Sequence, residues 1–173
     1  MRIISGSRRG HRIEAPPGHG TRPTSDRVRE NVFNILGSVE DGTVLDLYAG
    51  SGAMGLEALS RGAAHAVFVE RDADAVRAIE RNLDKLKLRA TVLRQDAMAV
   101  LATETRKYDL VFVDPPYDMY PDIEPKLARH LPSVLGDAAV VVVETDARVQ
   151  PALPLDERTS RTYGSARITV YDA

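Results

Sequence analysis

Three acidic residues stand where a carboxylate could bind a small ligand. Asp46 lies four residues before Gly50 in "DLYAGSGAMG", Glu70 ends the apolar run "HAVFVE", and Asp96 follows "ATVLRQ". Each belongs to or follows a short run rich in β-branched residues, which is typical of a buried strand. Parallel strands meet at one edge of a sheet with their carboxyl ends, where the ligands of such sheets bind. The sequence therefore predicts a binding site that holds three carboxylates.

The glycines of this stretch, Gly50, Gly52 and Gly55, have the GxGxxG spacing of a dinucleotide site. In such a site a pyrophosphate binds the bare N-terminus of the helix, and Asp46 would repel it. A carboxylate there suits a ligand with an ammonium group and a sulfonium, so we predict S-adenosylmethionine. A lone acid at this position would more often belong to a turn. The predicted contacts from this turn are Asp46, Tyr48, Ala49, Gly50, Ser51 and Gly52.

The other two acids fit the rest of this cofactor. Glu70 lies 20 residues beyond Gly50, where a carboxylate can accept hydrogen bonds from both ribose hydroxyls, and Arg71 follows it. Asp96 could accept a hydrogen bond from the adenine amino group, and Ala97 could offer its N–H to the ring. The alternative for Asp96 is that it caps the helix that follows.

The tetrapeptide Asp114-Pro115-Pro116-Tyr117 follows the strand-like run "YDLVFV". It could be only a rigid turn, because proline cannot continue a strand ladder. Beside a methyl-donor site it has a chemical interpretation. The exocyclic amine of a nucleobase is a poor nucleophile, and Asp114 with the Pro115 carbonyl could accept its two N–H bonds and aim its lone pair at the methyl group. The prolines would hold these acceptors rigid, and Tyr117 could stack on an extruded base.

Other reactive arrangements do not occur in the sequence. The four histidines, His11, His19, His65 and His130, are scattered and there is no cysteine, so we expect no metal. There is no serine nucleophile elbow and no Walker lysine. The longest strongly apolar run, "AAVVVV" at 138–143, is too short to span a bilayer, and we expect a cytoplasmic protein.

Strand-like and helical segments alternate from residue 43 onward. The predicted strands are "TVLDLY", "HAVFVE", "ATVLRQ", "YDLVFVD" and "AVVVVE", and the predicted helices cover 53–61, 73–87, 96–103 and 121–131. This alternation predicts parallel strands joined by crossover helices. The last segment, "ERTSRTYGSARITVY", predicts two antiparallel strands joined around Gly164 and Ser165, because the connection is too short for a crossover. The expected fold is α/β, a doubly wound sheet that ends in an antiparallel hairpin.

The start of the chain is basic and the remainder is acidic. Residues 1–30 hold 7 arginines and 3 acidic residues, whereas the remaining residues hold 16 basic and 22 acidic residues. Residues 2–13 predict a small β-hairpin, 14–23 a linker rich in proline and glycine, and a helix starts at Thr24 or Ser25. We therefore divide the 173 residues into a basic N-terminal part, 1–23, and one domain, 24–173. A basic end favours a polyanionic partner, and a solvated terminus is the alternative.

Five segments occur in an order that resembles the RsmD family of bacterial 16S ribosomal RNA guanine-N2 methyltransferases: "RIISGSRRG", "TRPTSDRVRENVFNIL", "VLDLYAGSGAMGLEALSRGA", "FVERD" and "DLVFVDPPY". The resemblance covers nearly the whole chain. It implies the seven-stranded Rossmann-like sheet of class I S-adenosylmethionine-dependent methyltransferases and methylation of the 2-amino group of one guanine of small-subunit ribosomal RNA. It also implies that Asp46, Gly50, Gly52, Glu70 and Asp96 hold the cofactor and that Asp114 to Tyr117 are catalytic.

The resemblance assigns the N-terminal arm to the RNA. The candidate phosphate contacts are Arg8, Arg9, Arg12, Arg22, Arg27 and Arg29. Each of them could instead be only solvated, and Arg29 could pair with neighbouring acids. We expect that the substrate is 16S ribosomal RNA within the assembled small subunit, because so few phosphate contacts give limited specificity. A monomer is the default expectation for the oligomeric state.

Four other functions fit part of the sequence. The same tetrapeptide could serve adenine-N6 methylation of DNA or RNA. A glutamine-N5 protein methyltransferase would favour Asn in place of Asp114 and would have little use for an arginine arm. The glycine spacing alone would suit a dehydrogenase, and a non-catalytic RNA-binding protein could have kept the fold.

Overall fold

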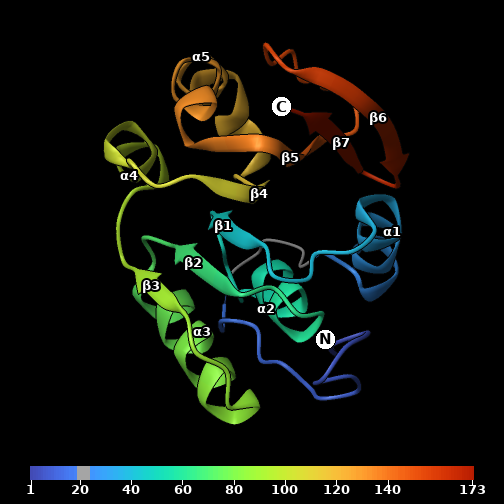
Figure 1. Cartoon of the computed structure of the whole chain (residues 1–173), viewed down its shortest axis with the longest axis vertical. Coiled ribbons are helices and arrows are strands. Elements are labelled where there is room, and N and C mark those ends of the chain that lie inside the picture. The colour runs from blue at the N-terminus through green and yellow to red at the C-terminus, as the bar shows by residue number, and fades with distance from the viewer. Residues whose placement is uncertain (19–23) are drawn as a thin grey trace.

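A single sheet of seven strands forms the centre of the computed structural model, which describes residues 1–18 and 24–173 (Figure 1). The strands are β1 (Thr43–Leu47), β2 (His65–Val69), β3 (Thr91–Leu93), β4 (Tyr108–Val113), β5 (Leu135–Asp146), β6 (Asp156–Tyr163) and β7 (Ala166–Asp172). Their order in the sheet is β3-β2-β1-β4-β5-β7-β6. The first five are parallel, and β7 is antiparallel to both β5 and β6. The predicted doubly wound sheet with a C-terminal antiparallel hairpin is confirmed.

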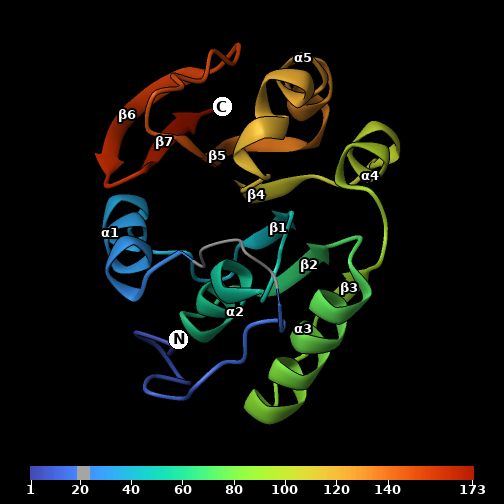
Figure 2. The ribbon, with the colours of Figure 1, turned by 180° about the vertical axis from the view of Figure 1, so that it is seen from behind.

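Helices cover both faces of this sheet. They are α1 (Asp26–Leu36), α2 (Ala53–Ser60), α3 (Ala73–Leu86), α4 (Ala97–Thr103) and α5 (Tyr120–His130), with short 3-10 helices η1 (Tyr117–Met119) and η2 (Leu131–Val134). Figures 1 and 2 show α1, α2 and α3 on one side of the sheet and α4 and α5 on the other. Strand side chains alternate accordingly, so that Leu45 packs toward α4 and α5 and Val44 toward α1 to α3. The chain changes sides between β1 and β4, and the carboxyl ends of these neighbouring strands form the switch point of the sheet.

The N-terminal arm, residues 1–18, packs against α2. Ile3 and Ile13 are almost completely buried and belong to the hydrophobic cluster on the α1 to α3 side. The expected hairpin is present in a short form: one bridge joins Arg2 and Arg12, and the N–H of Ile13 donates to the carbonyl of Met1 at 3.1 Å. The arm is thus anchored by apolar burial, while most of its arginines remain exposed.

Local signals in the sequence set the ends of α1. Ser25 accepts a hydrogen bond from the N–H of Val28 through its side chain, which caps the first turn. Gly37 ends the helix with a φ of 74°, a conformation that glycine adopts without strain. The helix predicted from Thr24 or Ser25 to Gly37 is therefore present.

Candidate active site

A cavity of about 800 Å³ opens at the carboxyl ends of β1, β2, β4 and β5. Four segments border it: the turn after β1, the loop after β2, the start of α4 and the tetrapeptide after β4. The predicted site residues that line it are Asp46, Tyr48, Ala49, Gly50, Ser51, Glu70, Arg71, Asp96, Ala97, Asp114, Pro115, Pro116 and Tyr117. The two groups of residues that the sequence assigned to a cofactor and to an amine substrate therefore share one cavity.

Asp46 lies inside β1 rather than in a turn, and it faces the start of α2. Only 2% of it is exposed, and its Oδ2 accepts a hydrogen bond from the N–H of Gly55 at 3.0 Å. Burial raises the pKa of Asp46 to about 8, the Gly55 hydrogen bond opposes this shift, and the charge of Glu70 adds to it. Because this carboxyl group already occupies an N–H of the first turn of α2, a pyrophosphate would meet it there. The geometry supports the argument against a dinucleotide.

The glycines of the turn have different roles. Gly50 lines the cavity and has a φ of 57°. Gly52 is buried and does not line the cavity: a Cβ at this position would lie 3.2 to 3.4 Å from Ile79, Phe68 and Leu56. The prediction that Gly52 contacts the cofactor is therefore not supported, because it faces the core, where its positive φ of 81° allows the turn into α2.

Glu70 joins two loops that border the cavity. Its Oε2 accepts from the N–H of Gly50 at 2.9 Å, and its Oε1 accepts from the N–H of Asp72 at 3.0 Å. Each carboxylate oxygen has a second lone pair, so both can still accept from a ligand hydroxyl. Arg71 is exposed beside Glu70 on the cavity wall.

Asp96 caps α4, as the alternative interpretation proposed. Its Oδ2 accepts from the N–H of Ala99 at 2.9 Å, and the residue also lines the cavity with Ala97. Tyr48 lines the same cavity, and its hydroxyl is buried and has no hydrogen-bond partner among the described residues. Burial and the charge of Asp96 raise the pKa of Tyr48 to about 12, so it remains a neutral donor. An unpartnered buried donor in a cavity wall is suited to a ligand acceptor.

The tetrapeptide leaves β4 next to β1. Asp114 donates its N–H to the carbonyl of Leu47, and its side chain makes no hydrogen bond with any residue in the described ranges. Burial raises the pKa of Asp114 well above its usual range, and the nearby charges of Glu144 and Asp46 raise it further. Tyr117 donates its hydroxyl to Oε1 of Glu144 at 2.9 Å.

Glu144 and Thr24 also line the cavity, although neither is among the site residues predicted from the sequence. Glu144 lies near the end of β5 and is 9% exposed, and its Oε2 accepts from the hydroxyl of Thr24 at 3.0 Å. Burial raises the pKa of Glu144, and its two hydrogen bonds lower it in part. The signal for Glu144 was present, because it ends the apolar run "AVVVVE" just as Glu70 ends "HAVFVE".

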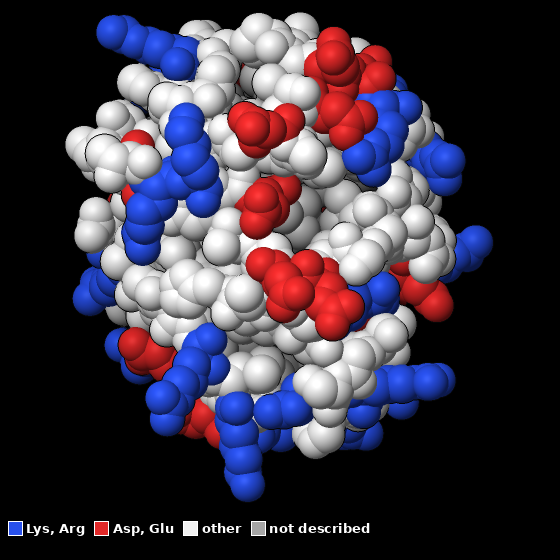
Figure 3. Space-filling view, in the orientation of Figure 1, with Lys and Arg blue, Asp and Glu red and all other residues white. Residues whose placement is uncertain are grey.

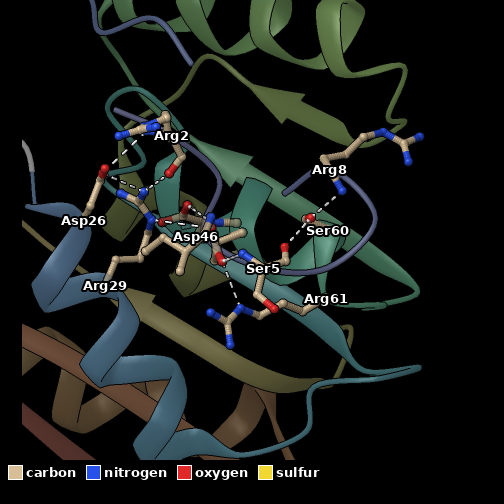
Figure 4. A network of polar contacts seen from close by, with 11 residues as sticks. Arg2, Ser5, Arg8, Asp26, Arg29, Asp46, Ser60 and Arg61 are labelled. Carbon is tan, nitrogen blue, oxygen red and sulfur yellow. Dashed lines mark hydrogen bonds and ion pairs between the residues drawn. The ribbon is translucent and has the colours of Figure 1, made fainter. Parts of the chain in front are cut away.

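The candidate RNA-binding arginines differ in exposure. Arg29 is fully buried, which contradicts its assignment as a phosphate contact. It pairs with Asp26 at 2.9 Å and with Glu57 at 3.6 Å and donates to the carbonyl of Arg2, so the alternative of pairing with acids is confirmed (Figure 4). It joins α1, α2 and the arm.

Arg8 is partly buried, and its Nε donates to the carbonyl of Leu86 at 2.5 Å at the end of α3. Its backbone N–H donates to the hydroxyl of Ser60, as Figure 4 shows. Arg9, Arg12 and Arg27 are exposed, and Arg22 lies outside the described residues. The exposed candidates are thus Arg9, Arg12 and Arg27.

Within the described ranges, no group of three His, Cys, Asp or Glu side chains is arranged to hold a metal ion. None of the described helices combines the length and the apolar character that crossing a membrane requires.

A family model, two relatives and a solved structure match this chain. The family model described as Conserved hypothetical protein 95 matches residues 1–172. A Bacillus subtilis (strain 168) protein named "Putative rRNA methyltransferase YlbH" is 39% identical over 185 aligned positions, which cover 99% of this chain and 98% of that protein. Ribosomal RNA small subunit methyltransferase D of Escherichia coli (strain K12) is 47% identical over 119 residues, which are 68% of this chain and 60% of the relative. The solved structure of yhhF from Escherichia coli has a TM-score of 0.86 at 36% identity, covering 99% of this chain and 97% of that one.

Proposed function

The chain belongs to the RsmD family, whose model is described as Conserved hypothetical protein 95, and we propose that it transfers a methyl group from S-adenosylmethionine to the exocyclic N2 amine of a guanine in 16S ribosomal RNA. The observation that carries this proposal is the position of Asp114 and Pro115. They lie at the end of β4, in the same cavity as the carboxylates of β1 and β2. An amine bound by the tetrapeptide would therefore adjoin a cofactor bound at the turn after β1.

The residues present fit S-adenosylmethionine. The fit rests on the buried Tyr48 hydroxyl, which has no partner in the described part of the chain, and on the carboxyl groups of Asp46 and Glu70 at one edge of the sheet. Asp46 would lie near the cationic amino-acid part, Glu70 would bind the ribose hydroxyls, and Asp96 with Ala97 would border the adenine. The bound cofactor supplies an electrophilic methyl group on a positively charged sulfur.

The start of the tetrapeptide offers two acceptors for an amine. The carbonyl of Pro116 already accepts from the N–H of Met119 at 3.0 Å. The carbonyl of Pro115 and the side chain of Asp114 make no hydrogen bond with the described part of the chain. These two acceptors can bind the two N–H groups of a guanine N2 and orient its lone pair.

Methyl transfer to the guanine N2 also releases one proton, which a residue of the site must accept. Transfer forms a bond between N2 and the methyl carbon, breaks the bond between that carbon and sulfur, and releases a proton from N2. Asp114 would accept this proton, because it lines the cavity where the amine would bind. Burial and the neighbouring carboxyl groups of Glu144 and Asp46 raise the pKa of Asp114, which makes its ionised form a stronger base. From Asp114 the proton can pass to solvent at the mouth of the cavity.

We assign RNA contacts to the basic N-terminal part, residues 1–23, and to the start of α1. Arg9, Arg12 and Arg27 are exposed there and can contact phosphates. On the face seen in Figure 1, Asp and Glu side chains gather along the middle and Lys and Arg lie mainly toward the margins (Figure 3). That face therefore suits a phosphate backbone poorly. With so few contacts, a monomer would depend on the shape of the assembled subunit for specificity.

The proposal is tested by incubating the protein with methyl-labelled S-adenosylmethionine and either free 16S ribosomal RNA or small subunits that lack the modification. Wild-type protein should label the RNA, and Asp114→Ala should reduce labelling by about 100-fold or more. Both proteins should bind S-adenosylhomocysteine within about twofold of each other, because Asp114 is assigned to the amine. Digestion of the product to nucleosides should give N2-methylguanosine. N6-methyladenosine, label in protein, or equal labelling by Asp114→Ala would contradict the proposal.

A further inference from the structure

We infer that Glu144 is a positioning residue for the target base, because it holds the ring of Tyr117 beside Asp114 and is itself held by Thr24. The inference rests on the proposed function. It extends that proposal by adding β5 to the elements that form the binding site for the guanine.

The register of the sheet places Glu144 next to the tetrapeptide. Val113 and Val143 are partners in the pairing of β4 with β5, so Asp114 and Glu144 follow them at the next position. Oε1 of Glu144 accepts from the Tyr117 hydroxyl at 2.9 Å, and Oε2 accepts from the Thr24 hydroxyl at 3.0 Å. One carboxyl group thus connects the end of β5 with the start of η1 and with the segment before α1.

A buried carboxyl group at this position is costly for folding. Val141, Val142 and Val143, which precede it in β5, are all buried, and another apolar residue would continue this pattern at lower cost. Asp114 lies close enough for the charge of Glu144 to raise its pKa, which adds to the cost. The two hydrogen bonds of the carboxyl group reduce this cost, and we attribute the remainder to its role in fixing the geometry of its partners.

Tyr117 is the side chain whose geometry Glu144 fixes. It starts the three-residue helix η1, and it is partly exposed at the cavity wall. A stacking platform works best when its ring is held before the base arrives, because ordering it later would reduce affinity. The bond from the hydroxyl to Glu144 supplies this restraint at the far end of the ring, and the Thr24 bond keeps Glu144 in the rotamer that reaches it.

The experiment is a double-mutant cycle on kcat/KM for RNA methylation. Tyr117→Phe removes the hydroxyl but keeps the ring, and Glu144→Ala removes the acceptor. Each should lower kcat/KM about tenfold, mainly through KM for the RNA, and the double variant should be no worse than the poorer single variant. Glu144→Gln keeps an acceptor for Tyr117 and a donor for Thr24, so it should stay within about threefold of the wild type.

The chain offers a matched control pair away from the cavity. Tyr108 donates its hydroxyl to Oε2 of Glu104 at 3.0 Å, at the opposite end of β4. Tyr108→Phe and Glu104→Gln should leave kcat/KM for the RNA unchanged. Binding of S-adenosylhomocysteine within about twofold of the wild type will show that each variant retains the fold and the cofactor site.

The possible failures are distinguishable. If the wild type labels RNA but the losses of Tyr117→Phe and Glu144→Ala multiply in the double variant, Glu144 does not act through Tyr117 and the inference is overturned. If Glu144→Gln falls as far as Glu144→Ala, the charge matters rather than the positioning, and the inference is again overturned. If the wild type fails to label any ribosomal RNA, the proposed function itself is wrong and the role of Glu144 falls with it.

Discussion

At the scale of single residues, Asp46 is a carboxyl group held in an environment that disfavours its charge. Burial raises its pKa to about 8, compared with 3.8 for an unperturbed group. Since the folded protein then binds a proton that the unfolded chain releases, the free energy of unfolding should fall as the pH rises from about 4 to about 8. A cationic ligand would favour the ionised form, and its binding should release a proton.

Asp46→Asn tests this linkage. The amide keeps an acceptor for the N–H of Gly55 but cannot ionise. Between pH 5 and pH 8, the free energy of unfolding of the ligand-free variant should therefore decrease by a few kcal/mol less than that of the wild type. Urea unfolding at the two pH values measures the change. The exposed Asp122→Asn serves as control and should keep the wild-type pH dependence. An equally steep dependence in Asp46→Asn would show that other groups cause it.

Arg29 and Arg27 lie two residues apart in α1, but substitution of Arg29 should affect stability and substitution of Arg27 should affect RNA binding. Arg29→Ala removes the buried partner of Asp26 and Glu57, so it should lower the free energy of unfolding by about 3 kcal/mol. Arg27→Ala should leave stability within about 0.5 kcal/mol of the wild type and weaken RNA binding. Urea unfolding and an RNA-binding titration on both variants distinguish the roles, and a stable Arg29→Ala that binds RNA poorly would reverse the assignment.

These residues also show what the sequence can predict about the site. Glu70 and Asp114 could be located because each follows an apolar strand, and parallel strands bring such positions together. Glu144 obeys the same rule, but its value depends on Tyr117 and Thr24, whose approach to β5 is a tertiary contact. The burial of Arg29 had a weaker signal: it is three and four residues before Val32 and Phe33, on the buried face of α1.

At the scale of elements, the alternation of strands and helices was readable because each crossover helix has its own periodicity. The predicted helix 73–87 corresponds to α3, and the hairpin around Gly164 corresponds to β6 and β7. The sequence did not indicate that β7, and not β6, lies beside β5. That choice is determined by which strand buries its side chains: Ile168 and Val170 of β7 are buried, whereas β6 consists mainly of exposed polar residues.

The attachment of the arm to α2 depends on close backbone contact at Gly6. A Cβ at Gly6 would lie 1.9 Å from the carbonyl oxygen of Ser60, whereas a Cβ at Gly10 would meet nothing within 4 Å, and both glycines have positive φ. Gly6→Ala should therefore displace the arm and lower RNA methylation at least tenfold, while Gly10→Ala shows only the cost of the backbone conformation, about 1 kcal/mol. Activity and thermal unfolding of the two variants measure this difference. If Gly6→Ala and Gly10→Ala had the same activity and the same thermal stability, the contact of Gly6 with Ser60 would not hold the arm.

At the scale of the whole molecule, charge is distributed unevenly along a chain whose net charge is only -2. Acidic groups concentrate in the cavity, where they suit a cationic cofactor, and the exposed arginines of the arm and of α1 lie outside it. A phosphate backbone responds to such local clusters rather than to the net charge. Under the proposed function, this distribution would let the exposed arginines bind RNA phosphates while the acidic side chains of the cavity disfavour phosphates there.

Binding to RNA should therefore depend steeply on salt, and a defined part of that dependence should come from Arg9, Arg12 and Arg27. Each phosphate contact that is lost reduces the slope of log K against log salt concentration by a little under 1, so the triple alanine variant should lower the slope by about 2 to 3. The measurement is a series of RNA-binding titrations between about 50 and 200 mM salt. Arg106→Ala, an exposed arginine just before the amino end of β4, is the control and should leave the slope unchanged. A triple variant with the wild-type slope would show that the phosphates bind elsewhere on the protein.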